Sequence, residues 1–87
     1  MKPTLKTVEE EWAGFSAMIF HKCKPTETQV IETRKAFFAG ALAMLTATRQ
    51  IGEPEISEAE GVAYMESRWQ ECQEFYAKLI GEYARTN

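Results

Sequence analysis

The chain has 87 residues, of which 45% are apolar and 26% are charged, which is the composition of one small globular domain. Two cysteines exclude a disulfide scaffold, and a net charge of −3 excludes a strong basic field for nucleic acid. The opening segment 1–5 lacks the apolar stretch of a signal peptide, so we expect a reduced, cytoplasmic protein.

The first predicted element is a helix over about residues 5–21. Apolar residues recur along this stretch at spacings of three and four, which places them on one helix face. The helix begins at Thr4 or Thr7, and Thr7 with Glu10 has the spacing of a capping box. It should end before Pro25, because proline disfavours helical geometry in the preceding residue.

The second predicted element is a helix over residues 27–50. Thr26 and Gln29 have the spacing of a second capping box, and Gly52 is expected to end the helix in the left-handed conformation. Small residues recur four apart on this helix and permit close approach of another helix. Tight packing inside the chain's own bundle and a self-association face both explain them. These interface candidates are Ala36, Gly40, Ala43 and Ala47.

The third predicted element is a helix over residues 58–85 that begins with a capping box at Ser57 and Glu60. Apolar residues alternate at spacings of three and four over three heptads. The connection over residues 52–56 is short, which predicts an antiparallel hairpin of the second and third helices. The predicted fold is therefore all-α, with a short first helix packed on a long helical hairpin in a single domain over residues 1–87.

Helix lengths predict association between chains. At about 1.5 Å per residue, the third helix spans about 40 Å and the first only about 25 Å. The short first helix cannot cover the full length of the hairpin, so part of the apolar groove along the third helix stays exposed to solvent. Exposed apolar patches of this kind usually mark an interface. We therefore expect a homo-oligomer that completes the fold. The remaining interface candidates are Tyr76, Leu79 and Tyr83.

Motifs that would indicate catalysis are missing from the sequence. It contains no glycine-rich phosphate loop, no nucleophile elbow and no Cys-x-x-Cys pair. His21 is the single histidine, and Cys23 is too close to it along the chain for productive pairing. The longest apolar run, residues 36–45, is too short to span a bilayer. We expect no enzyme activity, no cofactor, no metal site and no membrane partner.

Positive charge gathers immediately before the second predicted helix. Together with free N–H groups of the helix start, it could hold a phosphate-bearing ligand, or it is a solvated linker. Duplex DNA binding is disfavoured because so few basic residues give little electrostatic affinity. Arg34 is expected to pair with a glutamate of the third helix, or to recognise a partner carboxylate or phosphate. The anion-site candidates are Lys22, Lys24, Thr26, Thr28, Arg34 and Lys35.

A motif across the first two predicted helices carries a resemblance. It consists of Trp12 and Phe15, then Gln29, Glu32, Arg34 and the run Ala36-Phe37-Phe38-Ala39-Gly40-Ala41. It resembles a family of small uncharacterised helical proteins encoded by phages and prophages, over roughly residues 12–45. The resemblance implies an accessory protein in the bacterial cytoplasm that counters host defence, and it brings no functional residues with it.

Two functions from different classes follow. The first is a non-enzymatic oligomeric binding protein that acts on a host macromolecule. The second is sequestration of a small phosphate-bearing ligand, such as a signalling nucleotide, at a site between subunits. A structural phage assembly component is a further alternative.

Overall fold

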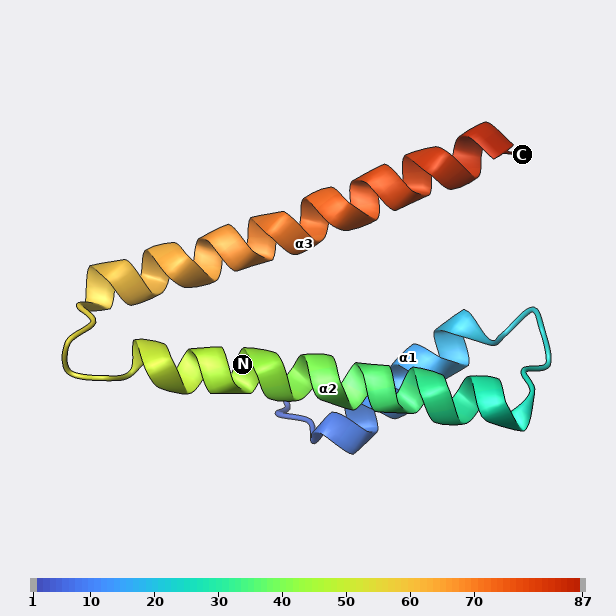
Figure 1. The fold of residues 1–87 in the computed structure, drawn as a ribbon, viewed down its shortest axis with the longest axis horizontal. Helices are drawn as coiled ribbons and strands as arrows, with labels where there is room; N and C mark the ends of the chain where they lie inside the picture. Colours follow the sequence, from blue (N-terminus) through green and yellow to red (C-terminus); the bar gives the residue numbers. More distant parts are fainter. Residues whose placement is uncertain (1, 87) are drawn as a thin grey trace. The chain divides into compact units, whose positions relative to one another are not determined.

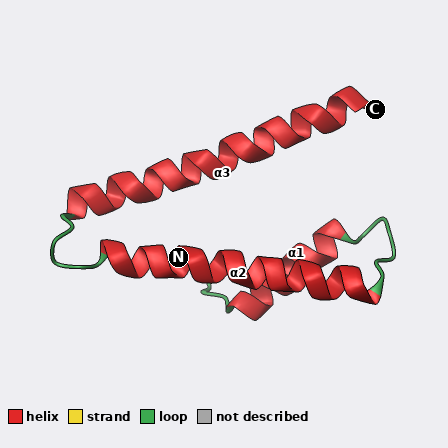
Figure 2. Cartoon of the chain, in the orientation of Figure 1, coloured by secondary structure: helices red, strands yellow, loops and turns green. Residues whose placement is uncertain are grey.

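The computed structural model describes residues 2–86, with side chains described as far as Glu82. It contains three helices, α1 over Val8–Ile19, α2 over Glu27–Ile51 and α3 over Glu58–Thr86 (Figure 1). No residue in the range 2–86 lies in a strand (Figure 2). The predicted all-α class is confirmed, whereas the helical hairpin and the oligomer remain predictions. None of the helices in the described range is long and apolar enough to cross a membrane.

The chain forms two compact units, Met1–Thr48 and Arg49–Asn87. The N-terminal unit contains α1 and most of α2. The C-terminal unit contains the last residues of α2, the connecting turn and α3.

α1 is shorter at both ends than the helix that the sequence predicts over about residues 5–21. Thr7 is the N-cap, and its side chain accepts a hydrogen bond from the Glu10 N–H while the Glu10 carboxylate accepts one from the Thr7 N–H. This capping box settles the start at Val8 and leaves Leu5 outside the helix, 88% exposed. After Phe20, the His21 ring donates from Nδ1 to the Met18 carbonyl at 2.8 Å. A side chain thereby satisfies a carbonyl of the last turn, where backbone partners run out.

α2 starts as predicted and ends differently. Thr26 and Gln29 form the expected capping box, with hydrogen bonds of 2.8 and 3.1 Å. The left-handed conformation predicted for Gly52 is wrong, because no described glycine has a positive φ. Instead, the N–H groups of Gly52 and Glu53 donate to carbonyls three residues back, both at 3.1 Å. The last turn tightens and satisfies these carbonyls without a change of backbone hand.

α3 begins at the third predicted capping box, in which Ser57 and Glu60 exchange two hydrogen bonds of 3.1 Å. Gly61 is buried against the end of α2, and a Cβ on it would lie 3.8 Å from the Ile51 carbonyl oxygen. This contact holds the start of α3 against the last turn of α2 inside the C-terminal unit.

Burial of apolar side chains is sparse in both units. Among the described side chains, Trp12 is the only large apolar one that is buried, at 6% exposure. Large apolar side chains on α2 and α3 are mainly exposed or half-buried. The helices are therefore defined by their caps and by backbone hydrogen bonds more than by a core.

Candidate functional site

An aromatic cluster joins α1 to α2 in the N-terminal unit. The rings of Trp12 and Phe15 lie 5.6 and 5.1 Å from the Phe37 ring of α2, measured between centroids. Phe38 lies next to Phe37 at 6.2 Å. Aromatic pairs attract at about 4.5–7 Å. The apolar stripe predicted for the first helix thus packs on α2 through its central residues.

Arg34 closes the edge of this cluster. Its guanidinium donates two hydrogen bonds to the Glu9 carboxylate of α1, from Nη1 at 2.8 Å and from Nη2 at 2.6 Å. The guanidinium carbon lies 4.7 Å from the Phe38 ring centroid and 6.0 Å from that of Trp12. The prediction that Arg34 pairs with a glutamate of the third helix is wrong, because α1 packs over this part of α2 and supplies the carboxylate.

The ion pair changes the acid–base behaviour of its partners. Hydrogen bonds from Arg34 favour the ionised carboxylate and lower the pKa of Glu9 below its usual value near 4.5. The same hydrogen bonds raise the pKa of Arg34. The two side chains are 44% and 60% exposed, so water screens their attraction. The pair therefore fixes how α1 is oriented on α2 more than it stabilises the fold.

The predicted anion site lies around the start of α2. Lys22, Lys24 and Thr28 are exposed there. Thr26 serves as the cap through its bonds with Gln29, so its hydroxyl already accepts a hydrogen bond from the chain.

The other two anion-site candidates lie farther along α2, and both have carboxylate partners. Arg34 bonds Glu9, and the Lys35 amine lies 3.3 Å from a carboxylate oxygen of Glu32. Three of the six candidates, with Thr26 among them, therefore bond inside the chain. The exposed lysines of the linker are left as the cationic part of the site.

A hollow of about 410 Å³ lies beside the aromatic cluster in the N-terminal unit. Phe38 contributes to both, and the Leu42 side chain is 67% exposed. Sequence reasoning did not identify this hollow. The signal for it was the spacing of Phe38, Leu42 and Leu45, which follow each other four and three residues apart along α2. The lining residues are Val8, Phe38, Ala39, Ala41, Leu42 and Leu45.

The small-residue face of α2 is open. Ala36, Gly40 and Ala43 are exposed, and Ala47 is half-buried. A Cβ built on Gly40 meets no atom within 4 Å. The self-association proposed for this face therefore has room for a close neighbour.

The apolar stripe predicted on the third helix forms a seam along α3, and most of this seam is exposed. Trp69 is 68% exposed and Tyr76 is 54% exposed, whereas Leu79 is half-buried. The side chain of Tyr83, the last interface candidate, lies outside the described residues. Beside the seam, the Arg68 guanidinium lies 5.4 Å from the Tyr64 ring centroid, and its Nε lies 3.4 Å from a Glu71 oxygen.

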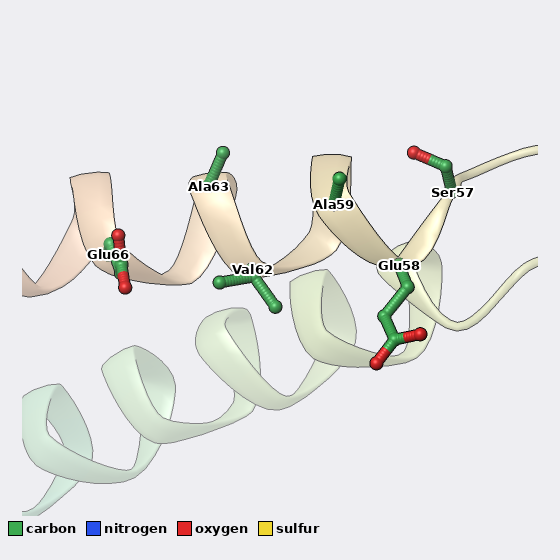
Figure 3. A pocket seen from close by; sticks show the side chains of 6 residues that line it. All are labelled: Ser57, Glu58, Ala59, Val62, Ala63 and Glu66. Carbon is green, nitrogen blue, oxygen red and sulfur yellow. The ribbon is translucent and has the colours of Figure 1, made fainter.

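A second hollow lies at the start of α3 (Figure 3). The figure shows Ala59 and Ala63 projecting from neighbouring turns in the same direction. The Ser57 hydroxyl is already used as the helix cap. The other polar groups are the carboxylates of Glu58 and Glu66, so this surface has no cationic group for an anion.

Groups that could perform chemistry are scattered. Cys23 and Cys72 are exposed free thiols, and the described Nδ1 contact of His21 is with the Met18 carbonyl. No cluster of three or more histidine, cysteine or acidic side chains suited to a metal occurs in the part of the chain that the structure describes.

Comparison with known proteins returns no match to a family model, a curated protein or a solved structure.

Proposed function

We propose that this protein is a non-enzymatic, oligomeric binding protein that packs its apolar helix faces against other protein surfaces. The observation that carries the proposal is the contrast between the one buried Trp12 and the exposed apolar faces of α2 and α3. Burying one large apolar side chain contributes about 1.5–3 kcal/mol, and contiguous exposed patches typically mark interaction sites.

The use of the polar side chains supports binding over catalysis. Thr7, Thr26 and Ser57, which could otherwise serve as nucleophiles or ligands, cap the three helices. A nucleophile needs a base within hydrogen-bond reach that is itself oriented by a third group. The described contact of the His21 ring is with a backbone carbonyl.

On the resemblance to phage and prophage proteins, we propose that the partner is a bacterial host protein met in the cytoplasm. The hollow beside the aromatic cluster is the proposed contact surface. Its two exposed leucines, Leu42 and Leu45, are apolar anchors at helical spacing.

Comparative capture from a bacterial lysate tests this proposal. The bait carrying Leu42→Glu and Leu45→Glu should lose a protein that the unchanged chain retains. A matched bait with Thr48→Glu and Gln50→Glu carries the same added charge on exposed positions of α2 and should retain it. Circular dichroism checks that both baits keep their helices. Equal recovery on all three baits would count against the proposal.

The second candidate function is sequestration of a phosphate-bearing ligand, such as a nucleotide, between subunits. It is favoured by the exposed linker lysines Lys22 and Lys24, neither of which has a carboxylate within 4.0 Å among the described side chains. A ligand at 100 times its dissociation constant stabilises the folded state by about 2.7 kcal/mol. Thermal denaturation with linear and cyclic nucleotides should then show a raised midpoint that Lys22→Ala with Lys24→Ala abolishes.

A further inference from the structure

We draw no further inference here: the strongest candidate, the uncharged surface patch of α2 over residues 36–48 with its open small-residue face around Gly40, carries no proposal because nothing in the structure shows what covers it.

Discussion

α1 and α3 are built from the same local pattern and differ in what covers them. Each begins with a capping box and carries apolar residues at spacings of three and four. In the N-terminal unit, Trp12 of α1 is buried against Phe37, and Glu9 is bonded to Arg34. In the C-terminal unit, Trp69 of α3 is 68% exposed. An apolar stripe therefore predicts a helix and its contact face, but it does not identify the neighbour.

The largest expected effect comes from the buried tryptophan. Trp12→Ala removes the centre of the aromatic cluster, and substitutions of this type in a packed site cost about 3–5 kcal/mol. Urea denaturation at low protein concentration should show this loss. Trp69→Ala, at an exposed site, should change stability under the same conditions by less than about 0.5 kcal/mol. Equal losses at the two positions would abolish the distinction between the units.

The helix caps should give the next largest effect. Thr7→Ala and Ser57→Ala each remove the side chain that accepts from the third helical N–H, at a typical cost of about 1 kcal/mol. Amide hydrogen exchange should report faster exchange in the first turn of α1 or α3. Thr7→Ser keeps the hydroxyl and should leave exchange unchanged. An alanine variant with native exchange rates would show that the cap is dispensable.

A smaller, stabilising effect is expected on the open face of α2. Gly40→Ala adds a methyl group where nothing lies within 4 Å, and alanine favours a helix over glycine by about 0.8–1 kcal/mol. The thermal midpoint should rise. Gly14→Ala on α1 is equally unobstructed and is the control. A gain at position 14 alone would indicate that another helix approaches Gly40 closely.

The smallest expected effect is a decrease in the stability of the folded state at acid pH. Hydrogen bonds from Arg34 lower the pKa of Glu9, and the backbone N–H of Thr7, followed by its hydroxyl, lowers that of Glu10. The Ser57 N–H and hydroxyl lower the pKa of Glu60 in the same way. Groups of lowered pKa stabilise the folded state above about pH 4.5, and this contribution is lost as the pH falls through their folded-state values.

Glutamine substitutions separate the two units in this titration. Glu9→Gln together with Glu10→Gln should make the stability of the N-terminal unit less dependent on pH in the acid range. Glu60→Gln should do the same for α3. Helicity followed by circular dichroism between pH 6 and 2 checks this. An unchanged acid limb in all variants would assign the acid dependence to other groups.

The helix starts could be predicted because they depend on residues three apart. The capping boxes at Thr7, Thr26 and Ser57 all form, and each predicted helix is present. The end of α2 could not be predicted from Gly52 alone. A last turn closed by bonds to carbonyls three residues back makes the left-handed conformation unnecessary.

Partners distant in sequence were harder to predict. Arg34 was expected to pair with the third helix, and its partner Glu9 is 25 residues away on α1. Local spacing does not determine which of several glutamates reaches a guanidinium, because that depends on how helices pack. The hollow lined by Leu42 and Leu45 was missed for the same reason, because its surface exists only once α1 has covered one side of α2.

Each unit contains one of the two tryptophans, and they lie in opposite surroundings. Trp12 is shielded among aromatic rings beside a guanidinium, whereas the Trp69 indole meets water. The intrinsic fluorescence of the chain is therefore a sum of two separable signals. Emission from Trp12 should lie at shorter wavelength and resist collisional quenching by iodide. Emission from Trp69 should be quenched readily in the isolated chain and protected when α3 is covered. A Trp69→Phe variant leaves the N-terminal unit as the sole emitter, so the two units can be followed optically without any added label.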